Sequence, residues 1–442
     1  LQLSAIDGIS FRGEDGEIIE TPDREPLALD RIPFYYKDIP PEQMEHRIVY
    51  YESSRGCPFS CAYCLSSVEK GLRFRSLSKV LEELDYFLEQ KVPQVKFIDR
   101  TFNCKKSHAM AIWNHILEKD RGITNFHFEI AADLLDEEEL ELLGQMRPGL
   151  VQLEIGVQST NPETLKVIHR PTDLEKIGCT TARINEGKNI HQHLDLIAGL
   201  PFEDFASFQN SFNQVYAMRP EQLQLGFLKV LNGSPMEAMA NGYGIVSSPN
   251  PPYEVLFTPW LSYKEVLALK GVEEMVEIHY NSRQFVTAMS LMEREFASPY
   301  EMFEALARYY EREGLDRLSH SRMARFEILW NFISGLGLGA ETMEEYRDAL
   351  MTDLYLRENA KSRPSFARVP SYARQQAVRL LKGREENPPV LMEYRQMDSG
   401  QRARLFHLEE MRDGSLLLFD YRRRDPLSYN AVCWEIQIHA LS

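Results

Sequence analysis

The sequence predicts an α/β protein: a parallel sheet with helices, followed by a mostly helical region that ends in a small β element. Three observations support this fold class. Between residues 47 and 235, short apolar runs alternate with amphipathic segments of helical length, which is typical of parallel sheets. After Pro235, a stretch rich in Gly, Pro and Ser leads into consecutive amphipathic segments. Near the end, two apolar segments flank Arg-Asp-Gly-Ser at residues 412–415, which is a hairpin signal.

The first 46 residues predict a hairpin and a linker. Apolar and polar residues alternate over residues 6–20 on both sides of Glu14-Asp15-Gly16, which indicates a hairpin. The connector that follows is rich in proline, which favours an extended linker that wraps one domain onto another. Its prolines are Pro22, Pro26, Pro33, Pro40 and Pro41.

Six strands and four helices are predicted between residues 47 and 235. The strands are expected at residues 47–52, 95–99, 126–131, 151–157, 191–198 and 222–228. The helices are expected at residues 78–90, 109–118, 136–146 and 203–218. The helix at 136–146 starts with carboxylates in its first turn, where the helix dipole favours negative charge.

The last 200 or so residues predict helices and a terminal β element. Amphipathic helices are expected at residues 262–280, 298–312, 320–336 and 341–357. Hairpin strands are expected at 403–411 and 416–421, with a final strand at 432–439. The sequence therefore predicts three parts: an N-terminal hairpin and linker (1–46), an α/β core (47–235) and a helical C-terminal domain with a terminal hairpin (236–442).

Composition narrows the class of protein. Of the 442 residues, 43% are hydrophobic and 26% charged, as in soluble globular proteins, and no run of eighteen apolar residues predicts a membrane span. The formal net charge of −16 argues against a nucleic-acid partner. Six cysteines fit a reducing, cytoplasmic compartment. Because the chain starts at Leu1 rather than Met, we expect it to be a fragment of a longer protein.

Three cysteines predict a metal cluster. Cys57, Cys61 and Cys64 are separated by three residues and then by two. Thiolates are the soft ligands that iron–sulfur centres select. Three protein ligands would leave one iron of a [4Fe–4S] cluster open, which favours catalysis over simple electron transfer. A zinc site normally has four ligands, and no further Cys or His follows at zinc-finger spacing.

This segment, CxxxCxxC with Tyr63 before the last cysteine, resembles the signature of the radical S-adenosylmethionine (SAM) superfamily. The resemblance implies a partial (β/α)6, TIM-like barrel. It also implies that the open iron binds SAM, and that one electron cleaves SAM to methionine and a 5′-deoxyadenosyl radical. The partners it implies are a reducing protein such as flavodoxin or ferredoxin and a small-molecule or peptide substrate, which the sequence does not name.

Two carboxylates near strand ends are candidate cofactor residues, since the active sites of α/β barrels lie at the carboxyl ends of the strands. Asp99 lies in a segment that resembles the Asp-Asx-Thr-Phe-type segment of cobalamin-linked radical SAM proteins, whose backbone holds the amino group of SAM. Alternatively, Asp99 caps the following turn. Glu129 lies among apolar residues, where a carboxylate needs a partner, so we expect it to bond a SAM hydroxyl or a neighbouring arginine.

The fourth strand carries a longer resemblance. Residues 152–159, Gln-Leu-Glu-Ile-Gly-Val-Gln-Ser, resemble the fourth-strand segment of oxygen-independent coproporphyrinogen oxidases and their relatives. The resemblance makes Glu154 a candidate cofactor residue. It also implies that Gly156 permits a close backbone approach, and that Gln158 and Ser159 line the SAM end of the barrel.

The fifth strand and two flanking residues complete the candidate SAM site. Residues 193–201 end in Gly-Leu-Pro and resemble the fifth-strand motif of the same relatives, which implies that backbone from Ile197 to Gly199 contacts adenine. Arg170 is the candidate for the SAM carboxylate. Tyr63 is expected to stack near the adenine or to shield the cluster.

Two further polar residues and the three remaining cysteines are not assigned to the cofactor. His193 and Asp195 either point into the barrel or serve as satisfied interior polar groups. Cys104, near the barrel mouth, is expected to be an inert small hydrophobe, with a radical or thiolate role as the alternative, and Cys179 and Cys433 are expected to be structural.

Both ends of the chain resemble parts of class B radical SAM proteins. Segments 6–12, 26–27 and 32–34 resemble the junction after a cobalamin-binding domain, and the C-terminal region resembles an uncharacterised domain that accompanies some of these proteins. The cobalamin-ligating pattern Asp-x-His-x-x-Gly does not occur in this sequence. Cobalamin would therefore be bound by a domain outside this chain.

The leading hypothesis is a radical SAM enzyme, with methyl transfer as its reaction if the longer protein carries cobalamin. A tRNA methylthiotransferase is one alternative, but it would need a second three-cysteine set and a basic RNA-binding module, and neither occurs in this sequence. A non-catalytic iron–sulfur sensor or scaffold is the other alternative. Such a protein would bind iron without cleaving SAM.

Overall fold

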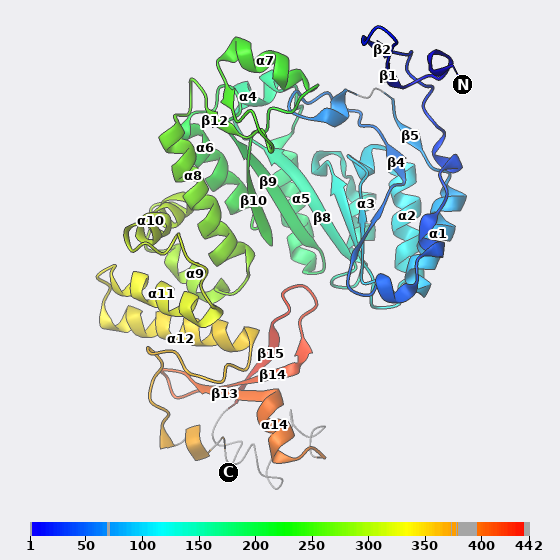
Figure 1. Cartoon of the computed structure of the whole chain (residues 1–442). Coiled ribbons are helices and arrows are strands. Elements are labelled where there is room, and N and C mark those ends of the chain that lie inside the picture. Colours follow the sequence, from blue (N-terminus) through cyan, green and yellow to red (C-terminus); the bar gives the residue numbers. More distant parts are fainter. Residues whose placement is uncertain (1, 69–70, 373, 377, 379–395, 437–442) are drawn as a thin grey trace.

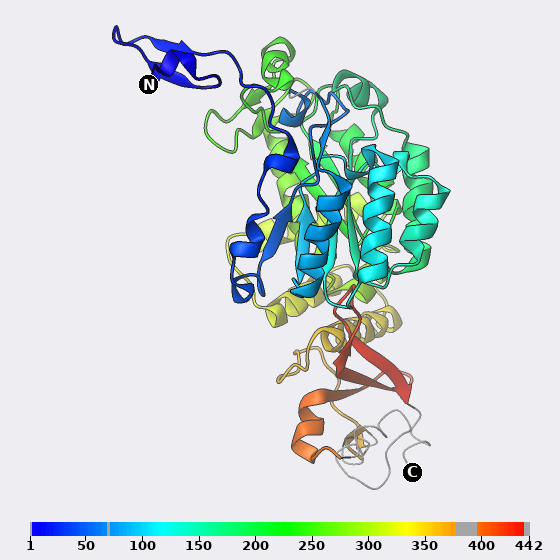
Figure 2. The same ribbon diagram turned by 90° about the vertical axis from the view of Figure 1, so that its right-hand side faces the viewer.

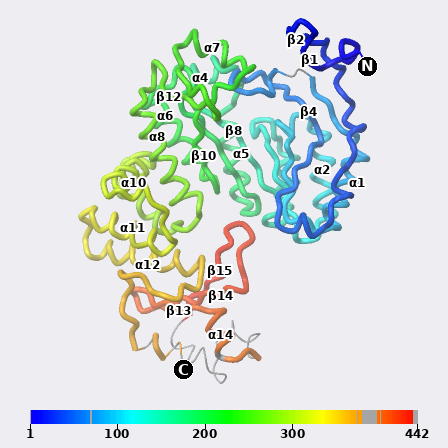
Figure 3. The backbone as a smooth tube through the Cα atoms, in the orientation of Figure 1, coloured from blue at the N-terminus to red at the C-terminus, as the bar shows by residue number. Residues whose placement is uncertain are grey.

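The computed structural model describes residues 2–68, 71–372, 374–376, 378 and 396–436, and it forms an N-terminal hairpin, an α/β core and a C-terminal part (Figure 1). The hairpin pairs β1 (Ser10–Arg12) with β2 (Ile18–Glu20) and stands away from the core (Figure 2). The linker contains the 3-10 turns η2 (Leu29–Arg31), η3 (Tyr35–Asp38) and η4 (Pro41–Gln43) and runs along the core (Figure 3).

The core is an open six-stranded parallel sheet, which confirms the predicted fold class. Its strand order is β10-β9-β8-β7-β6-β3, so each strand pairs with the next along the chain, and β3 and β10 form the two edges. All six strands lie where the sequence predicts them. Their bounds are β3 (Ile48–Tyr51), β6 (Gln94–Phe97), β7 (Asn125–Ile130), β8 (Val151–Gln158), β9 (His191–Ala198) and β10 (Gln222–Phe227).

Helices cover the outer face of the sheet (Figures 1 and 2). Their bounds are α1 (Leu77–Glu89), α2 (Lys106–Lys119), α3 (Glu137–Gly144), α4 (Pro162–Val167), α5 (Leu174–Gly187) and α6 (Phe205–Ala217). Helices α4 and α5 lie between β8 and β9, where the sequence analysis predicts none. The short turns η6 (Phe102–Cys104) and η7 (Ala132–Leu134) follow β6 and β7.

The two faces of the sheet differ in chemistry. Successive residues of a strand point to opposite faces. On the outer face, Phe97 and Phe128 are fully buried with ring centroids 4.6 Å apart, and Phe128 also contacts Trp113 of α2. On the concave face, strand pairing brings together polar residues, with Lys96 opposite His127. The outer face is therefore the hydrophobic core, and the concave face is available for polar chemistry.

The helical region after residue 235 packs onto the core and shares its hydrophobic cluster. It contains α7 (Pro235–Tyr243), the short strands β11 (Val246–Ser247) and β12 (Val255–Phe257), and then α8 (Tyr263–Val276), which continues as the π-turn η8 (Glu277–Asn281). Helices α9 (Val286–Met292), α10 (Pro299–Arg312), α11 (Arg322–Ser334) and α12 (Ala340–Arg357) follow.

Two contacts fix this region against the core. Tyr300 of α10 packs edge-on against Phe212 of α6, with centroids 5.6 Å apart. The Asn281 side chain accepts a hydrogen bond from Leu223 N and donates one to Leu223 O, both at 2.9 Å, on the outer edge of β10. The division into three domains at residues 46 and 235 stays a prediction, because one core spans the second boundary.

The C-terminal part is a three-stranded antiparallel sheet with a small core of its own. It contains α14 (Ser399–Leu405), β13 (Phe406–Glu410), β14 (Leu416–Arg424) and β15 (Ala431–Ile436). The strand predicted at 403–411 is partly wrong, because residues 403–405 end a helix that a capping box of Asp398 and Gln401 starts. The strand predicted at 432–439 corresponds to β15 as far as Ile436, and residues 437–439 lie outside the described residues.

Within the described part of the chain, no helix combines the length and the apolar character that crossing a membrane would require.

Candidate active site

The cysteine segment forms a loop at the carboxyl end of β3. The short strands β4 (Ser54–Arg55) and β5 (Arg73–Phe74) pair antiparallel and hold the two ends of this loop together. Gly56 has φ +97°, and a Cβ added there would clash with the carbonyl oxygen of Gly71. Only glycine suits both the conformation and the space, so the loop depends on Gly56.

The loop carries Cys57, Cys61 and Cys64 as free thiols, with Cys61 buried and the other two half-buried. Its middle is anchored at Ala62, whose N–H donates to Ile168 O (2.9 Å) and whose carbonyl accepts from Met236 N (2.8 Å). The structure therefore fastens the loop both to the segment after β8 and to the start of α7.

Two polar side chains approach the cysteine sulfurs. Cys57 Sγ lies 3.5 Å from Thr101 Oγ1, and Arg170 Nη1 lies 3.7 Å from Cys61 Sγ. Hydrogen bonds and positive charge next to the sulfurs stabilise thiolate ligands. Three soft donors in such surroundings fit an iron–sulfur cluster.

Arg170 connects the cysteine loop to the end of β8. Its Nη2 donates a short hydrogen bond to Gly156 O, while its Nη1 contacts Cys61. A Cβ at Gly156 would clash with the Gln158 side chain, and Gln158 itself has φ +73°. The end of β8 is therefore a tight turn directed toward the cysteine loop.

Three predicted cofactor residues line one cavity. Tyr63 from the cysteine loop, Gln158 from β8 and Ile197 from β9 border a cavity of about 440 Å³, which lies within the usual size range of ligand pockets. The opposite wall comes from β10, the segment that follows it and the helical region. The cavity lies between the cysteine loop and the carboxyl ends of the strands, where the sequence analysis expects SAM.

Two other predicted residues lie behind this cavity. Ser159 is fully buried and donates to Glu203 Oε1 at 2.6 Å, and burial raises the pKa of Glu203 to about 7. Gly199 has φ +85°, and a Cβ there would lie 2.7 Å from Val255 Cγ1. Neither residue borders the cavity. Ser159 supports the end of β8, and Gly199 lets β12 approach β9.

The Asp99 side chain anchors the segment before the cysteine loop. It is buried and accepts hydrogen bonds from Ser53 N (2.9 Å), Ser53 Oγ (2.7 Å) and Ser54 Oγ (2.6 Å). His108 Nε2 lies 3.0 Å from the same Ser53 hydroxyl. Burial raises the pKa of Asp99 to about 6 despite these bonds. The expected contact of this segment with SAM stays a prediction, and it concerns the backbone rather than the carboxyl.

Glu129 and Glu154 lie deeper on the concave face. Contact with the His127 ring and with the Lys96 ammonium, each 2.9 Å from Oε2, holds the pKa of Glu154 at about 2. Burial, and then the charge of Glu154, raises the pKa of Glu129 to about 7. The nearest arginine to Glu129 is Arg100, at 3.9 Å.

Several residues that build this site were not predicted from the sequence. Lys96 is the polar residue in Val95-Lys96-Phe97, and its place in an otherwise apolar strand is a signal that could have marked it. Glu254, directly before β12, and Lys270 and Glu273 of α8 also line the cavity, and Glu254 forms an ion pair with Lys270. No motif marks these three, because only packing brings them to the cavity.

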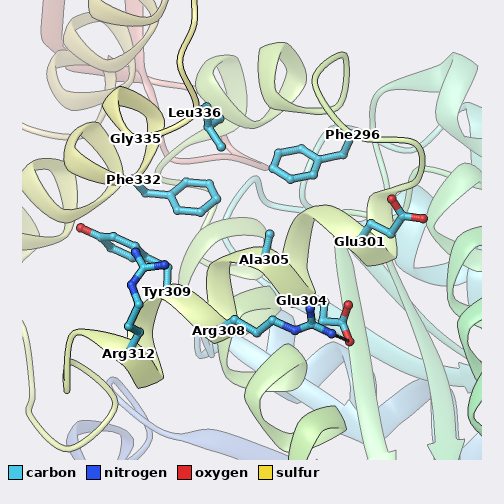
Figure 4. Close-up of a pocket in the computed structure, with 10 residues that line it drawn as sticks. All are labelled: Phe296, Glu301, Glu304, Ala305, Arg308, Tyr309, Arg312, Phe332, Gly335 and Leu336. Atoms are coloured by element: carbon cyan, nitrogen blue, oxygen red, sulfur yellow. Dashed lines mark ion pairs between the residues drawn. The ribbon is translucent and has the colours of Figure 1, made fainter.

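A second cavity, of about 540 Å³, lies on the helical region between α10 and α11 (Figure 4). Aromatic rings, two arginines and two glutamates border it, and Arg308 pairs with Glu304 at 2.9 Å. None of the predicted site residues lines it. It is therefore not the site that the cysteine loop serves.

Two families match adjoining parts of the chain. Residues 51–215 match the radical SAM superfamily, and residues 241–417 match a protein family of unknown function, DUF4080. The first match covers the cysteine loop and the sheet as far as α6. The second covers the β11–β12 hairpin, the helical region and the start of the C-terminal sheet.

Three curated relatives are similar to the core. The chain is 29% identical over 178 residues to an uncharacterized methyltransferase of Pyrococcus horikoshii (38% of this chain, 37% of the relative). It is 21% identical over 226 residues to the anaerobic magnesium-protoporphyrin IX monomethyl ester cyclase of Rubrivivax gelatinosus (49% and 40%). It is 25% identical over 218 residues to the cobalamin-dependent radical SAM methyltransferase TokK of Streptomyces tokunonensis (46% and 31%). The matches span two fifths or less of these relatives' lengths.

Proposed function

We propose that this chain, whose residues 51–215 are a radical SAM domain, is the catalytic part of an enzyme that binds a [4Fe–4S] cluster on Cys57, Cys61 and Cys64 and cleaves SAM. One observation carries the proposal: Tyr63 of the cysteine loop borders the same cavity as Gln158 and Ile197, at the carboxyl ends of the strands. When bound, the cluster would supply the electron that converts SAM to methionine and a 5′-deoxyadenosyl radical, which removes a hydrogen atom from the substrate.

The residues around the cavity have separate roles in this proposal. Arg170 stabilises the thiolate of Cys61 by hydrogen bonding and charge, and the Thr101 hydroxyl lies beside the sulfur of Cys57. Arg170 stays the candidate for the SAM carboxylate, because its guanidinium contacts both the cysteine loop and the end of β8. Tyr63 and Ile197 are assigned to the apolar surface around the adenosyl group.

The other predicted cofactor residues divide into two groups. We assign Gly156 and Gln158 to contacts with SAM. Ser159 and Gly199 are assigned to holding the ends of β8 and β9 in place. Asp99 positions the start of the cysteine loop through Ser53 and Ser54. We leave Glu129 and Glu154 out of the cofactor contacts, because neither carboxylate borders the cavity.

Methyl transfer is the reaction we favour after SAM cleavage. Two of the relatives are named as methyltransferases and one of these as cobalamin-dependent, whereas the third is named as a cyclase. Cobalamin would come from a domain outside this chain. An electron donor such as flavodoxin or ferredoxin, in a reducing cytoplasmic setting, would reduce the cluster.

Anaerobic reconstitution with iron and sulfide, followed by dithionite and SAM, tests the proposal. We expect about four irons per chain and formation of 5′-deoxyadenosine, as a [4Fe–4S] cluster with an open iron requires. Replacing Cys57, Cys61 and Cys64 with Ala should abolish both. The matched control is Cys179→Ala, which removes an exposed thiol far along the sequence from the loop.

The outcomes separate the alternatives. A full cluster without 5′-deoxyadenosine would favour a non-catalytic sensor or scaffold. Retention of a full cluster in the triple variant would exclude the assignment of the three ligands. Transfer of a methylthio group to tRNA by the reconstituted enzyme would favour the methylthiotransferase alternative.

A further inference from the structure

The concave face of the sheet carries a group of titratable side chains that the proposed SAM site does not use. Glu154 of β8, and His193 and Asp195 of β9, each present one possible ligand atom, and these atoms all lie within 4.8 Å of one another. Strand pairing explains the arrangement, because Glu154 lies opposite His193 and Gly156 lies opposite Asp195. His127 of β7 adds a fourth donor, with Nε2 2.9 Å from Glu154 Oε2.

The two histidines are buried and incompletely bonded. His127 is 6% exposed and His193 is 7% exposed. His193 Nε2 lies 3.1 Å from Asp195 Oδ1. Within the described structure, however, neither Nε2 makes a hydrogen bond of acceptable direction. Burying a polar atom without a hydrogen bond is unfavourable, so a ligand here would satisfy nitrogen atoms that the fold leaves without one.

The charges around these donors favour a bound cation. Glu154 is flanked by the Lys96 ammonium at 2.9 Å, which supplies one positive charge. Two other carboxyls, those of Asp195 and Glu129, lie close enough to affect the same group of side chains electrostatically. Three carboxyls face two cationic side chains, Lys96 and Arg100, so the concave face carries at most one negative charge in excess.

We propose that Glu154, His193 and Asp195, with His127 beside them, bind one divalent first-row transition-metal ion on the concave face, separate from the cysteine loop. Imidazole nitrogen combined with carboxylate oxygen suits Mn²⁺, Fe²⁺, Co²⁺ or Zn²⁺, whereas Mg²⁺ and Ca²⁺ prefer oxygen alone. The donor atoms come from three adjacent strands of the sheet, β7, β8 and β9, so small side-chain rotations bring them to metal–ligand distance.

The ion would face the cavity of the proposed active site. Asp195 borders that cavity together with Gln158 and Gln224. An ion held by three or four protein donors keeps an open coordination position, which can take an oxygen atom of a substrate. The Lys96 ammonium would compete with the ion for the Glu154 carboxylate.

Titration of the cluster-loaded protein with Mn²⁺ tests this inference. The oxidised [4Fe–4S]²⁺ cluster is silent in electron paramagnetic resonance, so the six-line signal of free Mn²⁺ reports binding directly. We expect one Mn²⁺ bound per chain. Mn²⁺ prefers nitrogen and oxygen donors over thiolates, which keeps the measurement independent of the cysteines.

Variants with opposite expected effects locate the ion. His193→Ala and Asp195→Asn should weaken Mn²⁺ binding at least tenfold, since loss of even an outer-sphere partner costs about 10–100-fold. Lys96→Met should tighten it, because it removes the competing charge. The matched control is Asp136→Asn with Glu138→Gln, an exposed carboxylate pair around Lys106, and it should leave binding unchanged.

Absence of stoichiometric binding in the unsubstituted protein would overturn the inference, as would equal affinity in His193→Ala and the control. Iron content and the thermal midpoint of each variant report whether it folds. If the sheet tolerates none of the weakening substitutions, Lys96→Met decides, because unchanged or weaker binding in that variant contradicts the site. SAM cleavage is not the readout, so this test can fail while the proposed function stands.

Discussion

At the scale of single residues, Arg170 joins two parts of the candidate site that are far apart in sequence. Its guanidinium contacts the carbonyl of Gly156 and the sulfur of Cys61, which a lysine cannot do with one ammonium. The sequence marked Arg170 as a candidate only through the resemblance. Its contact with Cys61 could not be predicted, because 109 residues separate the two in the chain.

Arg170→Lys should slow the formation of 5′-deoxyadenosine by about tenfold or more, since a hydrogen bond to a charged group contributes roughly 1.5–3 kcal/mol. Single-turnover assays with dithionite measure the rate, and iron analysis reports the cluster. Lys166→Arg, in the preceding helix α4, is the control and should react normally. An unchanged rate in Arg170→Lys, with full cluster content, would remove Arg170 from the site.

The cysteine loop depends on one glycine. Gly56→Ala should lower the iron bound per chain severalfold, because the new Cβ meets the Gly71 carbonyl and the backbone is left-handed. Gly71→Ala is the matched control: it has φ +114° but open space around the added Cβ. Iron and sulfide analysis after reconstitution compares the two. Equal losses would mean that backbone conformation, and not the contact with Gly71, limits the loop.

At the scale of elements, the strands of the core could be predicted and two helices could not. Each strand is a short apolar run with helical segments around it, so length and period identify it. Helix α5 (Leu174–Gly187) was not predicted, because Thr180 and Thr181 occupy buried positions between Ile177 and Ile184 and weaken the apolar stripe of the helix. Its N-cap, Asp173, which accepts from Lys176 N, is the signal that could have found it.

The start of helix α9 depends on a buried carboxyl from α12. Asp353 accepts hydrogen bonds from Thr287 N (3.0 Å) and Ala288 N (2.9 Å). Burial raises the pKa of Asp353 to about 6, from an ordinary value of 3.8. Between these values the folded chain keeps a proton on Asp353 that the unfolded chain has lost. The contribution of this group to stability therefore falls as pH rises from about 4 to about 6.

The variant Asp353→Asn cannot titrate at this position. Relative to this variant, the unsubstituted protein should lose roughly 2–3 kcal/mol of unfolding free energy between pH 4 and pH 6.5. Urea unfolding of both proteins at the two pH values, without the cluster, measures the difference. If the stability of the unsubstituted protein relative to Asp353→Asn stays constant or rises between these pH values, the raised pKa is contradicted.

At the scale of the whole molecule, the candidate site is built from two stretches of the chain. One is the α/β core with its cysteine loop, and the other is the helical region after residue 235. The cysteine loop and strand ends were predictable from motifs. The wall formed by Glu254, Lys270 and Glu273 was not, because it arises when α8 packs against β10 and Glu254 pairs with Lys229, after the end of β10. No local pattern encodes which surface of one stretch meets another.

The shared core predicts that the barrel and the helical region unfold together. Trp113 in α2 lies in the core cluster, and Trp330 in α11 packs against the same cluster. Tryptophan fluorescence and far-ultraviolet circular dichroism of the unsubstituted protein should give the same midpoint in urea, as expected for one cooperative unit. Two separated midpoints would show that residue 235 is a true domain boundary.

The side chain of Asn281 has a consequence for the behaviour of the protein in concentrated solution. An open sheet ends in strands whose free N–H and C=O groups can recruit a strand from another molecule. At Leu223, the amide of Asn281 takes both groups, as a neighbouring strand would. The edge of β10 is thereby closed to self-assembly at this position, and Asn281→Ala would expose a template for aggregation.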